Sequence, residues 1–302
     1  MMKRWGIELL LVTVVIIWGT NYTIGKYGIV ELSVIDFTAL RVAVAAPLLL
    51  LLTFYIEKSL RIDKRDIFRL IVVSIVGITL YQTLFMETIK YTSATNASLL
   101  ISISPIFTAV FVILLKQETF SVRKGIGSLF ACVGAALVLL SGTSLSNSLY
   151  GNVIGLVTSI CWGIYPVLAA PLMKKYSALR VTAWSTAIAA VPLMIMSGPS
   201  ILQVPFHIEQ SSTWFSLAYS IFFVTVYGLV VWYIGVQKIG ASHTMVYMYV
   251  TPFVAVVFAA MWAKEHVSLQ QLIGGLIIFL GLWFVKSEKK TKNLIVSQNI
   301  SK

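Results

Sequence analysis

The sequence predicts an all-α polytopic membrane protein with ten transmembrane helices, arranged as two inverted repeats of five helices each. Its composition, the length of its apolar runs and an internal duplication together predict this fold class. Of 302 residues, 58% are hydrophobic, 11% are charged and the mean hydropathy is +0.90, whereas soluble domains carry about 25% charged residues. Nearly the whole length is therefore assigned to membrane segments with short connectors, which leaves no room for a water-soluble catalytic domain.

An internal duplication is visible at two spacings. At a shift of 147, residues 92–138 align without a gap with residues 239–285 through these pairs: Ala94/Ala241, Pro105/Pro252, Glu118/Glu265, Ser121/Ser268, Gly127/Gly274 and Gly134/Gly281. At a shift of 144, the first two spans align with the sixth and seventh through these pairs: Trp18/Trp162, Gly19/Gly163, Ser33/Ser177, Thr38/Thr182, Ala39/Ala183, Ala45/Ala189 and Ala46/Ala190. Internal duplication in a hydrophobic chain is typical of transporters.

The spans follow from the apolar runs, because about 20 apolar residues are needed to cross a bilayer. In chain order we expect them at 7–29, 34–56, 67–89, 92–115, 122–141, 151–173, 178–197, 213–235, 240–262 and 268–286. The first run follows Lys3 and Arg4, as the apolar part of a signal peptide would. We expect a transmembrane helix instead, because no small-residue cleavage site follows it and its repeat partner around Trp162 is internal.

Positive charge predicts the direction of the spans, because cytoplasmic connectors carry an excess of Lys and Arg. With the N-terminus in the cytoplasm, 19 of the 23 Lys and Arg residues fall on that side, only Lys26, Lys90 and Lys264 fall outside, and Arg41 lies within a span. The sequence therefore predicts a multi-pass protein of the cytoplasmic membrane with both termini in the cytoplasm. Because each half has five spans, the second copy would enter from the opposite side, which predicts inverted repeats.

The remaining composition argues against several classes of function. The net charge of +12 is explained by topology and by attraction to the anionic inner leaflet, so no nucleic acid is expected as a partner. Cys132 and Cys161 lie in apolar runs, which indicates small core residues and neither a disulfide nor a metal pair. The sequence contains no HExxH, GxSxG or Walker motif and no paired acidic residues deep in a span. No enzyme activity, metal or cofactor is therefore predicted.

The duplicated stretch and the first span carry a resemblance to a known family. The residues concerned are Ala94, Pro105, Glu118, Gly127 and Gly134, their copies Ala241, Pro252, Glu265, Gly274 and Gly281, and the group Trp18, Gly19, Asn21, Lys26 and Arg41. Together they resemble the EamA domain of the drug/metabolite transporter superfamily, over residues 7–286. The second half departs from the pattern, because Tyr165 and Ser185 stand where Asn21 and Arg41 would be.

The resemblance implies ten helices packed as two inverted repeats around a central cavity. It also implies secondary transport, often export of amino acids or related metabolites. We place the first EamA repeat at residues 1–141, the second at 149–286 and a basic cytoplasmic tail at 287–302.

Aromatic and amide side chains that share helix faces are the candidates for substrate binding. Trp18, Asn21 and Tyr22 lie at helical spacing on one face of the first span, and an aromatic face with one amide suits an amphipathic solute. The alternative is aromatic packing or the interfacial belt, for which Trp18 and Trp162 lie too deep. The further candidates come from other spans: Tyr81, Gln82, Phe85, Asn96, Trp162, Tyr165, Tyr227, Trp232 and His243.

Three basic side chains each admit a functional and a structural interpretation. Burial of an unpaired Arg41 would cost about 2.5–3.5 kcal/mol even on the lenient insertion scale, so it binds either a substrate carboxylate or, structurally, backbone carbonyls or Asp36. Lys26 either extends to the membrane surface or serves a gate. His243 either couples transport to protons, because its unperturbed pKa is near neutrality, or is a hydrogen-bonded residue at a helix start.

The duplicated prolines and acids also admit two interpretations. Pro105 and Pro252 lack an N–H group and should kink their helices and free the carbonyls four residues earlier. Such kinks either open space beside the cavity or only shape the packing. Glu118 and Glu265 either form gates or cap the neighbouring helices and compensate their dipoles.

The sequence therefore predicts a secondary transporter that exports small metabolites, amino acids or their relatives, by alternating access. Uptake or exchange of a sugar, nucleoside or organic cation is the alternative within transport. An intramembrane enzyme or a non-transporting sensor is the alternative from another class. The expected partners are a small-molecule substrate and the lipid bilayer, and the sequence is compatible with a monomer or a dimer.

Overall fold

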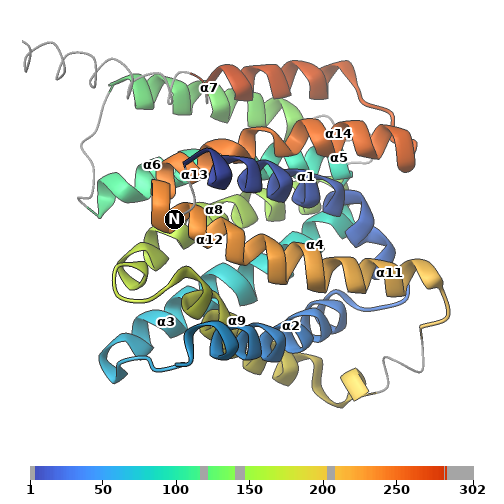
Figure 1. Ribbon diagram of the computed structural model, residues 1–302. Coiled ribbons are helices and arrows are strands. Elements are labelled where there is room, and N and C mark those ends of the chain that lie inside the picture. The colour runs from blue at the N-terminus through green and yellow to red at the C-terminus, as the bar shows by residue number, and fades with distance from the viewer. Residues whose placement is uncertain (1–3, 116–121, 140–146, 203–207, 282, 284–302) are drawn as a thin grey trace, which may run out of the picture.

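The computed structural model describes residues 4–115, 122–139, 147–202, 208–281 and 283. In this part of the chain every element is a helix (Figure 1). The first half contains α1 (Arg4–Gly28), α2 (Val34–Glu57), η1 (Lys64–Asp66), α3 (Ile67–Ser74), η2 (Ile75–Leu80), α4 (Tyr81–Tyr91), α5 (Ala94–Ile101), α6 (Ser104–Leu114) and α7 (Val122–Leu139). The second half contains α8 (Asn147–Met173), α9 (Ala178–Ser197), η3 (Gly198–Leu202), α11 (Ser211–Tyr219), η4 (Ser220–Leu229), α12 (Val230–Ile239), α13 (Ala241–Thr244), η5 (Met245–Tyr249), α14 (Thr251–Trp262) and a C-terminal helix (Leu269–Gly281).

Within the described ranges, eight helical segments are long and apolar enough to cross a membrane, as expected of a multi-pass membrane protein. They are Gly6–Gly28, Val34–Glu57, Lys64–Tyr91, Ala94–Leu114, Leu149–Met173, Ala178–Ser197, Ser211–Ile239 and Met245–Trp262. At the fifth and tenth predicted spans lie α7 and the shorter apolar helix Leu269–Gly281. The count of ten and the inversion of the repeats stay predictions. Glu118, Ser121 and the predicted tail lie outside the described residues.

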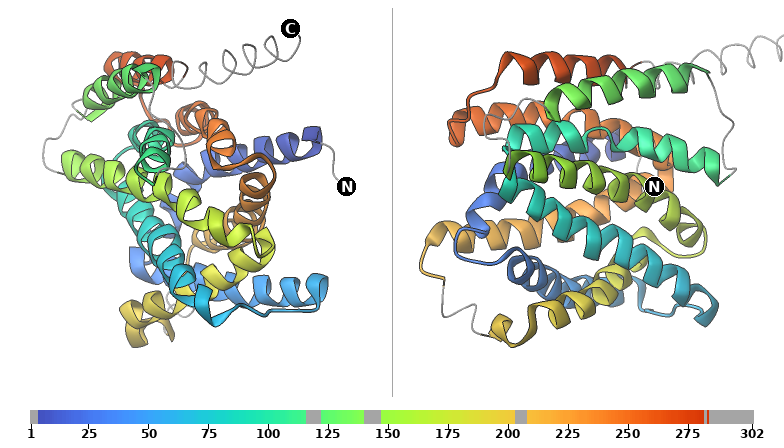
Figure 2. Two further views of the ribbon diagram at one scale, coloured as in Figure 1. Left: turned by 90° about the vertical axis from the view of Figure 1, so that its left-hand side faces the viewer. Right: turned by 180° about the vertical axis from the view of Figure 1, so that it is seen from behind.

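The helices are packed side by side, with one helix pair at each edge of the bundle (Figures 1 and 2). α2 and α9 form one edge, and α7 and the C-terminal helix form the other. At the second edge the helices approach closely, because a Cβ atom on Gly134 would lie 2.6 Å from the carbonyl oxygen of Gly274. Small residues that bring backbones together are typical of helix pairs in membranes. The helices between the two edges carry most of the aromatic side chains discussed below.

The α2–α9 edge shows what the residues matched at the shift of 144 do. Ser33 and Ser177 are the N-caps of α2 and α9, and each hydroxyl accepts a hydrogen bond from the backbone N–H three residues later, at 3.0 Å. Such caps satisfy N–H groups that have no partner inside the helix. The matched alanines Ala39, Ala183 and Ala189 are completely buried, so small side chains lie inside the bundle at this edge.

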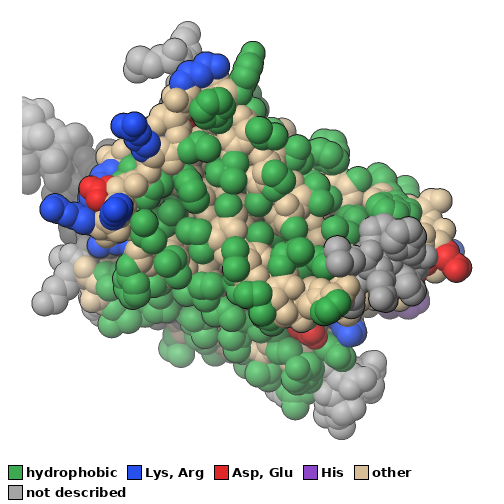
Figure 3. All heavy atoms as spheres, turned by 90° about the horizontal axis from the view of Figure 1, so that it is seen from below, with side chains coloured by type: hydrophobic (Ala, Val, Ile, Leu, Met, Phe, Trp, Pro, Cys, Tyr) green, Lys and Arg blue, Asp and Glu red, His purple; other side chains and the backbone are tan. Residues whose placement is uncertain are grey.

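On the face shown in Figure 3, hydrophobic side chains cover most of the middle, and charged side chains gather toward the two ends. One end, which we name the basic end, carries these exposed side chains: Lys58, Arg61, Lys64, Arg65, Arg69, Lys174 and Lys175. There the end of α2 and the following segment η1 are bound to the connector after α8 and to the start of α9. Arg180 donates to Glu57 through both Nε (2.9 Å) and Nη2 (2.6 Å), and Lys175 donates to Asp66 at 3.0 Å. The hydrogen bond to Asp66 raises the pKa of Lys175.

The opposite end, which carries the connector between α1 and α2, has contacts of its own between the two halves. The Glu31 carboxylate accepts hydrogen bonds from the Thr213 hydroxyl and from the backbone N–H groups of Glu209 and Gln210. These donors lower the pKa of Glu31, with Thr213 contributing most. Both ends of the bundle are therefore bridged by polar contacts, but the residues differ.

Four of the spans are irregular, and this feature shapes the interior. The third contains the π-helical segment η2 between α3 and α4, and the eighth contains the π-helical segment η4 between α11 and α12. Near the middle of the fourth span, α5 ends and α6 begins. In the ninth, the 3₁₀ segment η5 precedes α14. π-Helical turns inside α-helices occur frequently at functional sites.

The duplicated prolines lie directly after these breaks. Pro105 and Pro252 each occupy the first turn of a new helix, α6 and α14, where a missing N–H costs nothing. The carbonyl of Ile101, four residues before Pro105, accepts a hydrogen bond from Ser159 Oγ of α8 at 3.4 Å. A role of either proline in transport stays a prediction.

We expect the basic end to be cytoplasmic, because Lys and Arg accumulate on that side of membrane proteins. With Cys132 and Cys161 replaced by serine, Glu209→Cys should react with a membrane-impermeant maleimide in intact cells. Lys64→Cys should react only after permeabilisation. Both positions are exposed at opposite ends of the bundle, so the opposite labelling pattern would show that the predicted orientation is wrong.

Candidate functional site

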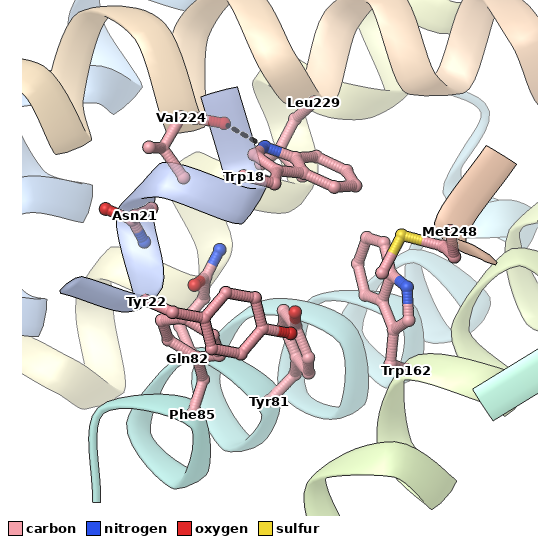
Figure 4. A pocket seen from close by; sticks show the side chains of 10 residues that line it. All are labelled: Trp18, Asn21, Tyr22, Tyr81, Gln82, Phe85, Trp162, Val224, Leu229 and Met248. Atoms are coloured by element: carbon pink, nitrogen blue, oxygen red, sulfur yellow. Dashed lines mark hydrogen bonds between the residues drawn. The ribbon is translucent and has the colours of Figure 1, made fainter. Parts of the chain in front are cut away.

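A cavity lies between the two halves, at the irregular turns of the third, eighth and ninth spans (Figure 4). α1 contributes three lining residues, α4 three, η4 two, and α8 and η5 one each: Trp18, Asn21, Tyr22, Tyr81, Gln82, Phe85, Val224, Leu229, Trp162 and Met248. Seven of these ten were candidates from the sequence. The wall is mainly aromatic, and its polar side chains include the Asn21 and Gln82 amides and the Tyr22 and Tyr81 hydroxyls.

Trp162 lies at the centre of the aromatic cluster and is completely buried. Its ring stacks on Tyr81 with centroids 4.5 Å apart, meets Trp18 edge-on at 5.2 Å, and lies 5.7 Å from Trp232. Tyr22 meets Phe85 edge-on at 5.1 Å on the other side of the cavity. Aromatic pairs at these distances stabilise one another beyond the area that they bury, so the cavity wall is held by contacts between helices of both halves.

Trp18 is fixed by the π-helical segment η4. Its indole N–H donates to the carbonyl of Val224 at 3.2 Å. The next residues of η4 allow the ring to approach, because a Cβ atom on Gly228 would lie 2.5 Å from Trp18 Nε1. The irregular turn thus supplies both a free carbonyl and the space for the ring.

Arg41 lies behind the cavity wall and is completely buried. Its Nη2 donates to Gln82 Oε1 at 2.8 Å, and Gln82 lines the cavity. Nε and Nη1 have no hydrogen-bond partner among the described residues. Asp36, the acid considered as a structural partner, accepts hydrogen bonds from Ser33 and Ser197 instead. The guanidinium also lies 5.8 Å from the centroid of the Phe37 ring, which compensates a cation only in part.

Tyr165 and Trp232 lie behind Trp162 and not in the cavity wall. The Tyr165 ring is 5.7 Å from Trp162 and meets Tyr233 edge-on at 5.2 Å. Four buried polar groups of this cluster have no partner with hydrogen-bond geometry within the described ranges: the hydroxyls of Tyr165 and Tyr233 and the indole nitrogens of Trp162 and Trp232. Buried polar groups of this kind are costly unless they are paired in another state of the protein or by a solute.

Three candidates from the sequence lie elsewhere. Asn96 belongs to a buried amide cluster at the opposite end, where it donates to Asn152 (3.3 Å) and accepts from Gln271 (2.7 Å). The Tyr227 hydroxyl pairs with Thr13 at 2.6 Å, away from the cavity. His243 is an exposed residue of α13.

Three lining residues, Val224, Leu229 and Met248, were missed as candidates. They are ordinary apolar residues with no distinguishing spacing, and only the irregular turns of η4 and η5 bring them to the cavity.

The comparison with protein families agrees with this arrangement. The sequence profile of the EamA-like transporter family matches residues 5–140 and 149–287. This chain belongs to the EamA-like transporter family. The resemblance inferred from the sequence is thereby confirmed, and the protein is a transporter of that type with multiple membrane-spanning helices.

Similar proteins come from bacteria and archaea. An uncharacterized transporter of Archaeoglobus fulgidus is 29% identical over 288 residues, which cover 93% of this chain and 98% of its own. The uncharacterized transporter YyaM of Bacillus subtilis is 27% identical, with 93% of both chains covered. A probable terminal-alkyne amino-acid exporter of Streptantibioticus cattleyicolor is 24% identical, with 91% of both chains covered.

A protein of known crystal structure has the same fold. It superposes with a TM-score of 0.67 at 16% sequence identity, covering 94% of this chain and 98% of its own. At this identity the likeness shows the fold alone.

We expect Gly77→Ala to disturb the cavity wall from behind. Gly77 lies in η2, and an added Cβ would overlap the Tyr165 ring, whose centroid lies 5.7 Å from that of Trp162. Overpacking of a tight interior typically costs about 1–3 kcal/mol, so the thermal unfolding midpoint in detergent should fall. Gly275→Ala is the matched control, because its Cβ would meet only the flexible end of Leu99 at 3.1 Å. An equal shift in both variants would contradict this role of Gly77.

Proposed function

We propose that this protein exports amino acids or closely related metabolites across the cytoplasmic membrane, by alternating access and without enzymatic activity. The observation that carries the proposal is the completely buried Arg41 guanidinium, which holds one neutral partner and has two unpaired nitrogens beside an aromatic cavity.

A buried cation whose hydrogen-bond partner is neutral would be stabilised by a nearby anion. Hydrogen bonds that involve a charged group are stronger than neutral ones, and the planar guanidinium matches the two oxygens of a carboxylate. Gln82 presents its amide to the cavity and binds Arg41 from behind. A solute carboxylate at this amide would therefore come close to the unpaired guanidinium nitrogens.

The rest of the cavity suits the other parts of an amino acid. The faces of Trp18, Tyr81 and Trp162 offer an apolar surface for a side chain, and aromatic faces also attract an ammonium group. A sugar would need many hydrogen-bonding groups, whereas most of the surface of this wall is aromatic or aliphatic. The amino-acid exporter among the similar proteins is consistent with the same solute class.

Arg41→Lys tests the carboxylate. The variant keeps the positive charge but loses the paired donors of the guanidinium. In liposomes, apparent affinity for a transported amino acid should fall about tenfold, the factor for one lost charged hydrogen bond. The matching amine, which lacks the carboxylate, should compete equally well with both proteins. Arg69→Lys at the exposed basic end is the control for an effect of the substitution itself.

Two outcomes would decide against the proposal. If Arg41→Lys weakens the amino acid and its amine equally, Arg41 is structural and the carboxylate site is wrong. If a screen of amino acids gives no flux but a sugar, nucleoside or organic cation is carried, the protein transports that other solute class.

A further inference from the structure

One carboxylate joins three elements at the end of the bundle opposite the basic end. Glu265, in the connector between α14 and the C-terminal helix, accepts a hydrogen bond from Lys26 Nζ at 3.2 Å. It also accepts from the backbone N–H groups of Ala94 (3.0 Å) and Thr95 (3.2 Å) and from the Thr95 hydroxyl (3.2 Å). We name the group Lys26, Ala94, Thr95 and Glu265 the clasp.

The clasp connects the two halves of the chain. Lys26 is in the last turn of α1, and Ala94 and Thr95 begin α5, so three of its members belong to the first half. The first N–H groups of a helix have no partner within it, and Ser93 caps that of Asn96. Glu265 therefore satisfies two N–H groups of α5 that would otherwise be unpaired, and it does so from the second half.

Burial opposes the charge of Glu265, but its partners outweigh that effect. The Lys26 ammonium and the two backbone N–H groups hold the pKa of Glu265 below its usual range. The side chains of Lys26 and Glu265 are 32% and 17% exposed, so the pair is only partly shielded from water. The contact is an ionised one in this conformation.

The helices held by the clasp also carry residues of the cavity wall, or follow directly on helices that do. Lys26 follows Tyr22 by one turn of α1, and α4, which carries Phe85, leads directly into α5. Asn96, the residue after Thr95, accepts a hydrogen bond from Gln271 of the second half at 2.7 Å. This contact further connects the start of α5 to the C-terminal helix. Helices α1, α4 and α5 therefore connect the clasp to the cavity wall.

We propose that the clasp is the gate that closes the cavity at the end opposite the basic end, and that it opens as a unit when the transporter exposes its solute there. The proposal rests on the alternating-access part of the proposed function and not on the amino-acid substrate.

The basic end is joined by different ion pairs. The residue matched to Lys26 at a shift of 144 is Ala170, which carries no charge. At the basic end the halves are joined through Glu57 with Arg180 and Asp66 with Lys175. Loss of the clasp should therefore favour one of the two open states, whereas a general loss of packing would expose both ends.

Two single-cysteine reporters test this difference in purified protein, with Cys132 and Cys161 replaced by serine. Phe85→Cys lies in the cavity wall toward the clasp, and Met245→Cys is 1% exposed at the start of η5, toward the basic end. In detergent a maleimide reaches both ends, so the measurement depends neither on membrane orientation nor on the substrate.

Glu265→Gln keeps the shape of the side chain and removes its charge. We expect the Phe85→Cys reporter to react about tenfold faster in this variant, which is the factor for one lost charged hydrogen bond. The Met245→Cys reporter should react more slowly. Lys26→Met should act in the same direction. Glu209→Gln, an exposed glutamate at the same end, should change neither rate.

The opposite results would overturn the proposal. Unchanged labelling in Glu265→Gln and Lys26→Met means that the clasp does not close the cavity. Faster labelling at both reporters means that Glu265 is a structural cap whose loss loosens the whole bundle. Neither result bears on whether the protein carries amino acids, which the Arg41 experiment decides separately.

Discussion

The interior of a membrane provides no water to pair with backbone N–H and C=O groups, and the irregular helices of this protein depend on that constraint. The described π-helical and broken turns lie in the third, fourth, eighth and ninth spans, around the cavity. Their free groups find partners in side chains: the Val224 carbonyl accepts from Trp18 and the Ile101 carbonyl from Ser159. The cavity therefore forms where regular helices are interrupted, and the interruptions are tolerated because neighbouring spans satisfy them.

Charged groups in the interior also need partners, but the buried charge of Arg41 is not neutralised by an acidic side chain of the described residues. Arg41 is buried with a neutral partner. The ion pairs of Glu57, Asp66 and Glu265 lie toward the two ends of the bundle. A glutamate in place of Gln82 would neutralise the guanidinium permanently and remove its need for an anion. The neutral amide leaves the charge available, which is the property that a solute site requires.

Most of the spans could be predicted from the sequence because bilayer thickness sets their length and apolar character. The second span, expected at 34–56, is Val34–Glu57 in the structure. Helical spacing groups Trp18, Asn21 and Tyr22 on one face, and all three line the same cavity in the structure, while their role in substrate binding stays a prediction. Tyr227 lies inside the π-helical segment η4, and its hydroxyl pairs with Thr13 outside the cavity wall. Asn96 and His243 were paired by the duplication, which indicates equivalent positions but not a shared cavity.

The indoles of Trp18, Trp162 and Trp232 are mutual neighbours, with ring centroids 5.0 to 5.7 Å apart. At such separations their electronic transitions couple, and the coupling depends on the angles between the rings. Because the three residues come from three helices in both halves, any rearrangement of those helices alters the near-ultraviolet circular dichroism. The protein thus carries its own optical probe beside the cavity, and this probe requires no label.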